Sequence, residues 1–516
     1  MKNSVFLPIL FSLLISTSLF GQAEGSYDLT YGNNGITVLD GSALDLNLEG
    51  MALQPDGKLI LAGYTNVSNK DAFLARLNLD GSLDQSFADN GFFIYDYAND
   101  YENIFRSVEV QEDGKIIAMG YHNYDDQYNW DLLVVRLNSD GTLDSDFGLN
   151  NGASSVGTSE RESVFNGSVA PSGKIVLTGN RLETDILPFL CRFNADGLPD
   201  DSFDGFMVTL DSPVLVGGYL TNAISDEDGN VYATGATEAF DFIVVKVLDN
   251  GAPDPNFGNN GILVLDSPNN IFDFGTSIRY SASGDLLYCG LSDEQLYISK
   301  IDTTTGDPIT SFGDNGKVII DVWNEFDIAE DIIELPNGQI IITGTSNQNQ
   351  SLSSLVVVKL NADGTRNEDW GLNGIVFYDF NGLDNFGIGS AVQPDGKIVS
   401  ASWSHGGQLI AIRYLNPDIT AVTNISPAAT GIQFYPNPSS GNTVTLEYVL
   451  QSPSDIQVDL FNALGQQIAV LIKGSRSSGL NTEALKLPSG LSTGIYLIQI
   501  KSNQGISTQQ LVLEPN

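Results

Sequence analysis

The sequence predicts an all-β protein: a seven-bladed β-propeller closed by the N-terminal strand, followed by a small immunoglobulin-like β-sandwich. Three observations predict this fold. A strand-and-turn unit recurs seven times, a single strand stands alone before the first copy, and the composition changes after the last copy. Glycine, at 53 of 516 residues, is typical of a fold with many tight turns.

The first 21 residues have the features of an export signal. Lys2 supplies a positive start, Val5–Phe20 is an apolar stretch, and Gly21 is a small residue at a cleavage point before Gln22. No later stretch approaches the run of about 20 apolar residues that a transmembrane helix needs. We therefore expect residues 1–21 to be a signal peptide, and the mature chain to leave the cytoplasm without a transmembrane segment.

The recurring unit begins with a hairpin. In its first copy, apolar residues 50–53 lead into the turn Pro55-Asp56-Gly57, and a β-rich run over 58–62 follows. A third strand over 72–78 and a fourth over 91–96 complete the copy. The turn glycines stand 54 to 59 residues apart, at Gly57, Gly114, Gly173, Gly229, Gly284, Gly338 and Gly396. Four short strands per unit predict a propeller blade rather than a helical solenoid.

An aromatic residue recurs before the fourth strand of the units. One ring per unit at a fixed position predicts packing between blades rather than ligand contact. The rings are those of Phe87, Phe147, Phe203, Phe257, Phe312 and Trp370.

The two ends of the repeat array complement each other. An isolated fourth strand lies over 35–40, whereas the seventh copy stops after its third strand, near Asn416. We expect residues 35–40 to complete the seventh blade and close the ring, so that no sheet edge stays open there. The predicted propeller therefore covers residues 25–416.

These units resemble the delta-sixty β-propeller repeats of bacterial secreted proteins and, more loosely, the NHL-type propeller. The resemblance rests on recurring strings of the form D-G-K-[IL]-[IL]-x-x-G and N-x-D-G-x-x-D-x-x-F-G-x-x-G, from which individual copies depart. It implies a fold and no particular activity, because propellers host many functions.

A second domain follows a linker over 417–430. Residues 431–516 alternate short strands with glycine turns, which predicts a β-sandwich. The block opens on Tyr-Pro-Asn-Pro, has Leu-Phe-Asn-Ala-Leu-Gly at its centre, and later holds Ser-Gly-x-x-x-Gly-Ile-Tyr-Leu-Ile. It resembles the type A C-terminal sorting domain of the type IX secretion system. The resemblance implies that type IX machinery exports the chain, to the medium or the outer-membrane surface. The alternative is a terminal sandwich that binds carbohydrate or stabilises the propeller.

The charge balance restricts the partners. With 23 Lys and Arg against 64 Asp and Glu, the formal net charge is −41. Such a surface repels nucleic acid and anionic membranes, whereas cations, carbohydrate or a basic protein face are compatible with it.

The sequence identifies no catalytic, cofactor-binding or metal-binding residue. It has two histidines in different repeats and none of the common hydrolase, metalloprotease or phosphate-binding motifs. The many carboxylates leave a glycosidase-type pair open without identifying one. The string Asn78–Asp84 and its copies resemble calcium loops in part, but Asn and Asp also stabilise turns, and we favour that structural use. Cys191 and Cys289 fall in non-neighbouring blades, so we expect two buried thiols rather than a disulfide.

Aromatic and histidine residues concentrate on one predicted face of the propeller. Loops on a rigid scaffold commonly bind ligands, and rings beside carboxylates suit sugars or cations, although such rings can also cap blade edges. The candidate ligand face consists of Tyr97, Tyr101, His122, Tyr124, Tyr128, Trp130, Trp323, Trp403 and His405.

The function predicted from the sequence is a non-enzymatic binding or adhesion module, secreted or held at the cell surface. Carbohydrate and surface proteins are the expected partners, and no cofactor is expected. A secreted polysaccharide hydrolase or lyase and a structural envelope component are the alternatives.

Overall fold

The computed structural model describes two compact units, Met1–Val422 and Thr423–Asn516. In the first unit it describes residues 24–41, 45–66, 70–96, 102–123, 130–157, 160–182, 184–265, 272–323, 326–348, 352–380 and 382–417. In the second it describes residues 430–437, 439, 441, 443–450, 453–462, 467–488, 491, 494–502 and 505–513. Every element in these ranges is a β-strand. No helix in them has the length and apolarity needed to cross a membrane.

The described part of the first unit folds into seven four-stranded antiparallel sheets. Six of them each take four consecutive strands, so a sheet forms from one stretch of chain. They are β2 (Leu46–Leu53), β3 (Leu59–Thr65), β4 (Ala72–Leu77), β5 (Phe92–Tyr95); β6 (Glu102–Val110), β7 (Ile116–Asn123), β8 (Trp130–Leu137), β9 (Ala153–Val156); β10 (Arg161–Val169), β11 (Ile175–Leu182), β12 (Ile186–Phe193), β13 (Met207–Thr209); β14 (Tyr219–Ser225), β15 (Val231–Ala236), β16 (Phe242–Val247), β17 (Ile262–Leu265); β18 (Phe274–Tyr280), β19 (Leu286–Ser292), β20 (Gln295–Ile301), β21 (Lys317–Ile320); and β22 (Asp327–Glu334), β23 (Ile340–Gln348), β24 (Leu352–Leu360), β25 (Ile375–Tyr378).

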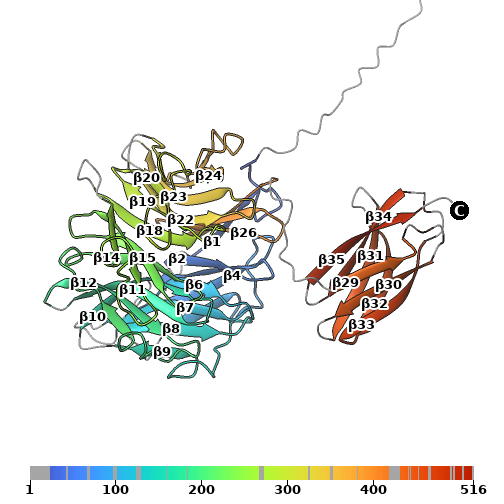
Figure 1. Cartoon of the computed structure of the whole chain (residues 1–516), viewed down its shortest axis with the longest axis horizontal. Coiled ribbons are helices and arrows are strands. Elements are labelled where there is room, and N and C mark those ends of the chain that lie inside the picture. The colour runs from blue at the N-terminus through green and yellow to red at the C-terminus, as the bar shows by residue number, and fades with distance from the viewer. Residues whose placement is uncertain are drawn as a thin grey trace, which may run out of the picture. The chain divides into compact units, whose positions relative to one another are not determined.

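The remaining sheet joins the two ends of the unit. Its order is β1 (Ile36–Asp40), β28 (Gln408–Tyr414), β27 (Ile398–Ser404) and β26 (Asn385–Val392), and β1 pairs antiparallel with β28 over its whole length. Figure 1 shows β1, from the start of the chain, in the same region of the unit as β26, from near the end of the unit; they are the two edge strands of this sheet. The first strands of successive sheets contact one another, and β26 contacts β2, so these strands form a closed circle. The predicted all-β fold with four-stranded propeller-type sheets is confirmed, and residues 36–40 pair as expected.

The hydrophobic core lies between neighbouring sheets. One buried cluster joins β3 and β4 of one sheet to β6, β7 and β8 of the next, and another joins β1 and β28 to the sheet that contains β24. The third strands are mostly buried because they have a sheet on either side, and Ala72–Leu77 is buried at every residue. The six repeated aromatic residues are all at most 2% exposed, as the packing interpretation predicts.

A cation on the third strand links successive sheets. Arg76 on β4 donates to Asp84 (2.8 Å) and to the carbonyl of Ser139 in the next sheet, and its guanidinium lies 4.6 Å from the Phe87 ring centre. Equivalent bonds to the next sheet come from Arg136, Arg192, Lys246 and Lys359, and from Arg413.

The same link joins the N-terminal segment to the last sheet. Arg413 pairs with Asp28 at 2.7 Å, and Lys397 pairs with Asp28 at 2.9 Å. Tyr31 takes the place of the repeated aromatic, under Arg413 at 4.7 Å. The circle is therefore closed by the β1–β28 pairing and by an ion-pair network.

The string Asn78–Asp84 forms a turn, and its last carboxylate forms ion pairs with basic side chains of the same repeat. Asp80 accepts the backbone N–H of Ser82 at 3.0 Å and its hydroxyl at 2.6 Å. Asp84 accepts Lys58 as well as Arg76. Because protein donors engage these carboxylates, the structure supports the structural use of the string.

The second unit has two sheets around one core. The first is β29 (Thr430–Tyr435), β30 (Thr443–Leu450) and β33 (Gly479–Lys486); the second is β32 (Gln467–Arg476), β31 (Ser454–Asn462), β34 (Gly494–Ser502) and β35 (Gly505–Leu513). Along β30 every second side chain is buried, which places Leu446 and Tyr448 against Val458 and Ile498 of the other sheet.

Candidate functional site

Each of the seven innermost strands carries a β-bulge at the same position. The pairing with the second strand shifts by one residue there, which leaves one residue unpaired. A bulge turns its side chain away from the regular alternation and is frequent beside functional sites. The bulged residue stands eight positions before the turn glycine in every copy. We call these residues the bulge ring: Glu49, Arg106, Phe165, Thr221, Thr276, Glu330 and Ile388.

The whole bulge ring lines one cavity of about 610 Å³. The aromatic side chains of Phe165, Tyr219, Phe274 and Phe386 line it too. A second cavity, of about 510 Å³, is lined by all seven innermost strands. It shares five lining residues with the first, namely Glu49, Arg106, Asn166, Glu330 and Ile388. The two cavities together form a channel inside the circle of strands, and their volumes are in the range of ordinary ligand sites.

The second cavity has two further layers of side chains. They stand seven and five positions before the turn glycines, on the same face of each strand. The seven-position layer is Gly50, Ser107, Asn166, Asn222, Ser277, Asp331 and Gly389; the five-position layer is Ala52, Glu109, Ser168, Ile224, Arg279, Ile333 and Ala391.

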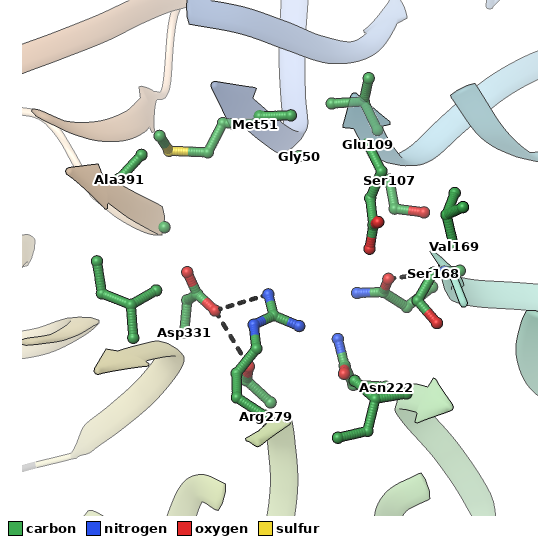
Figure 2. A pocket seen from close by; sticks show the side chains of 18 of the residues that line it. Gly50, Met51, Ser107, Glu109, Ser168, Val169, Asn222, Arg279, Asp331 and Ala391 are labelled. Carbon is green, nitrogen blue, oxygen red and sulfur yellow. Dashed lines mark hydrogen bonds and ion pairs between the residues drawn. The ribbon is translucent and has the colours of Figure 1, made fainter. Parts of the chain in front are cut away.

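Two arginines in the channel are each paired with a carboxylate. Arg106 donates to Glu49 at 2.6 Å, and Arg279 lies 3.1 Å from Asp331. Asp331 also accepts the Ser277 hydroxyl at 3.1 Å. Figure 2 shows the Arg279 side chain extending into the cavity with Asp331 beside it. Both positive charges of the channel are therefore compensated within the protein.

Two other carboxyl groups of the channel have raised pKa values. Burial, followed by the charges of Glu49 and Asp331, raises the pKa of Glu330 to about 7. Burial also raises the pKa of Glu109 to about 6, although Arg279 and the Val169 backbone N–H oppose the change. Such values are common at functional sites.

Several buried polar atoms in the second cavity have no hydrogen-bond partner within the described residues. They are Ser107 Oγ, Ser168 Oγ and Asn222 Oδ1, in side chains that are 7%, 5% and 4% exposed. Figure 2 shows these three side chains around the cavity, from three different strands. Buried polar groups are normally satisfied, so an unsatisfied set facing a cavity suits a polar ligand.

The predicted ligand face is only partly described. Tyr97, Tyr101, Tyr124 and Tyr128 lie outside the described residues. His122 is 1% exposed, and its Nε2 lies 2.5 Å from the Ser155 hydroxyl.

Three of the other four predicted residues, Trp130, Trp403 and His405, pack on rings close to the channel. Trp130 stacks on Tyr121 at 5.0 Å, and Tyr121 in turn lies against Arg106 of the bulge ring. Trp403 stacks at 5.3 Å on Phe386, which lines the first cavity. His405 contacts the same two rings and lies 3.1 Å from Asp384. Trp323 packs on Phe377 at 5.0 Å. Trp403 thus stacks on a ring that lines the channel, and Trp130 stacks on a ring that contacts a channel arginine.

The sequence interpretation missed the channel residues themselves. Their signal was a fixed position in the repeat at which Glu, Arg, Phe, Thr and Ile replace one another. A repeating fold needs similar residues where blades pack. A repeat position that holds chemically different side chains therefore indicates a surface that faces no neighbouring blade. Glu330 and Arg106 could have been found in that way.

The thiols have the predicted state. Cys191 and Cys289 are both buried and free. Burial raises the pKa of each thiol, which keeps both protonated.

Family models match segments in both units of the chain. A β-propeller domain of unknown function (DUF5122) matches residues 54–87, 111–147, 170–203 and 335–368. A secretion system C-terminal sorting domain matches residues 433–514. The chain thus carries DUF5122 β-propeller repeats and a type IX sorting tail, and it is secreted or located at the outer-membrane surface. No match is found among the curated proteins.

Solved structures give weak likenesses. PorZ of Porphyromonas gingivalis, described as a bacterial surface component of the type-IX secretion system, is 11% identical over 90% of this chain and 70% of its own, with a TM-score of 0.30. An acylaminoacyl peptidase of Pyrococcus horikoshii is 10% identical over 78% of this chain and 57% of its own (TM-score 0.35). A family 32 glycoside hydrolase of Bifidobacterium adolescentis is 10% identical over 89% and 85% (TM-score 0.26). Values this low assign no activity to the chain.

Proposed function

We propose that the chain is a non-enzymatic binding module of the cell surface or medium, and that its ligand site is the central channel. In this proposal residues 25–416 form a seven-bladed propeller, residues 431–516 an immunoglobulin-like sorting sandwich, and residues 1–21 a signal peptide removed on export. The type IX machinery is the partner of the sandwich. Carbohydrate is the ligand class that we propose for the propeller.

One observation carries the proposal: all seven innermost strands place a bulged residue on the same channel. Bulges interrupt the hydrogen-bond ladder, yet this one occurs in every repeat at the same position. The channel combines aromatic rings at the bulge ring with buried hydroxyl and amide groups further in. Rings stack on the apolar face of a sugar and polar groups bond its hydroxyls, so this combination suits carbohydrate.

A second candidate is a polysaccharide hydrolase or lyase. The raised pKa values of Glu109 and Glu330 favour it, because a carboxyl group that titrates near neutral pH can act as a general acid. Two of the four channel carboxylates, Glu49 and Asp331, are held by arginine, which leaves Glu109 and Glu330 as the one candidate pair among the described channel residues.

A glycan and polysaccharide binding screen on the full chain, followed by a product assay on each hit, separates the two. Saturable binding without product supports the binding module. Product whose formation is abolished by Glu109→Gln or Glu330→Gln supports the enzyme. Absence of any glycan binding contradicts both and leaves the structural envelope role.

A further inference from the structure

We propose that the channel recognises an amino sugar, a hydroxyl-rich ligand that carries a protonated primary amine, with the Glu330 carboxylate as the counter-charge. The inference rests on the proposed function and adds the chemical class of the ligand.

Glu330 differs from the other acidic residues of the channel. Glu49 is held by Arg106, and Asp331 is held by Arg279. The charge of Arg279 and the Val169 backbone N–H both favour the ionised form of Glu109. No hydrogen bond or ion pair engages Glu330 among the described residues. Both carboxylates that act on its pKa raise it, and no cation lowers it. A half-buried carboxylate in this position is unfavourable when ionised unless a cation arrives from outside the chain.

The charge balance of the channel excludes an anionic ligand. Four acidic side chains line it (Glu49, Glu109, Glu330 and Asp331), against two arginines, and each arginine is already paired. An anion would have to displace Glu49 or Asp331 from its arginine. A cation beside Glu330 displaces nothing.

Groups that recognise hydroxyls lie in the same cavity as Glu330. Ser107 Oγ, Ser168 Oγ and Asn222 Oδ1 are buried and without partners there, on the first strands of three successive sheets. They can donate to or accept from sugar hydroxyls, and a bare metal cation would leave most of them unsatisfied. An acidic cluster alone would not define a ligand, but these unpaired groups indicate one with hydroxyls.

Aromatic rings complete the site. Phe165 and Tyr219 form an edge-to-face pair at 6.0 Å, and both line the cavity that holds the bulge ring, as do Phe274 and Phe386. Ring faces stack on pyranose rings and attract ammonium groups. The site thus offers a separate partner to the amine, the hydroxyls and the apolar face of an amino sugar.

The test compares two ligands that differ at the nitrogen, which is a protonated amine in one and a neutral acetamide in the other. Glucosamine oligosaccharide and its N-acetylated counterpart are titrated calorimetrically into the full chain at pH 7. The same titrations are made with Glu330→Gln and with Glu227→Gln, which removes one exposed carboxylate from a hairpin turn outside the channel. We expect the wild type to prefer the glucosamine form at least tenfold, Glu330→Gln to lose that preference, and Glu227→Gln to keep it.

Other outcomes contradict specific parts of the proposal. Equal binding of the two oligosaccharides, or unchanged preference in Glu330→Gln, overturns the amine site and leaves the proposed carbohydrate-binding function intact. Absence of binding to both, and to every other glycan, overturns the proposed function itself. Glu330-dependent binding of a lysine-rich peptide without binding of glucosamine oligosaccharide identifies a protein partner and overturns the amino-sugar assignment.

Discussion

Replacement of Glu330 by Gln is expected to stabilise the protein by an amount that grows as the pH rises from about 5 to 8. The pKa of Glu330 is about 7 in the folded chain, against an ordinary value of 4.5. A raised folded-state pKa means that ionisation costs stability: the penalty is absent below about pH 4, grows as the pH rises towards 7, and is complete above that. At about 1.4 kcal/mol for each pH unit, the penalty at pH 8 is about 3 kcal/mol.

The glutamine keeps the shape of the side chain and removes the charge. Urea unfolding of the wild type and of Glu330→Gln at pH 5 and pH 8 measures the difference. We expect the variant to be more stable by about 2 to 3 kcal/mol at pH 8, and by less than about 1 kcal/mol at pH 5. Glu227→Gln, on the exposed surface, should change stability by no more than about 0.5 kcal/mol at either pH. A Glu330→Gln variant that is equally or less stable at pH 8 would refute the argument that this carboxylate is uncompensated.

Three further predictions concern closure, export and the thiols. Asp28→Asn should lower the free energy of unfolding by about 3 kcal/mol, because it leaves Arg413 buried without its charge partner. Chemical unfolding measures this change, and Asp144→Asn, which removes the carboxylate partner of Arg136, is the matched change in an internal sheet. Unchanged stability of Asp28→Asn would contradict closure by this network. Deletion of residues 431–516 should retain the chain inside the outer membrane, as cell fractionation would show, whereas release to the medium would contradict the sorting role. Cys191 and Cys289 should react with a thiol reagent only after unfolding, and fast reaction in the native protein would contradict their burial.

The closure network also has a pH signature. Burial alone would raise the pKa of Asp28, but hydrogen bonds from Lys397 and Thr30 and the charge of Arg413 outweigh it and hold the pKa well below its usual value. A lowered folded-state pKa contributes stability that is present above about pH 4 and is lost as the pH falls further. The stability difference between wild type and Asp28→Asn should therefore shrink in strong acid.

The sequence predicted the parts of the fold that depend on local repetition. The turn glycines fixed the hairpins, and the isolated strand at 35–40 indicated its partner at the other end of the array, where it pairs with β28. The sequence does not indicate Asp28 and Tyr31 as members of the closing network, because they precede the strand at 35–40 and lie outside the seven repeats. Their positions relative to Arg413 depend on a contact across 385 residues of sequence.

The candidate site was predicted less well, for a physical reason. Tryptophan and histidine draw attention in a sequence, yet Trp130 and Trp403 stack on rings that themselves face the channel or its arginine. The residues that line the channel owe their direction to a bulge, and a bulge shows only when two strands are paired. Burial of an uncompensated carboxylate at Glu330 is likewise a property of the assembled circle of strands.

If the ligand occupies the channel, a side chain that fills the channel should block binding. Ser168→Phe places a ring where a small unpartnered hydroxyl now lies in the cavity of about 510 Å³. The measurement is the affinity of this variant for the glycan that the wild type binds best, with the melting temperature as a check on folding. We expect at least a tenfold loss of affinity in a folded protein. Full retention of affinity would show that the ligand binds outside the channel.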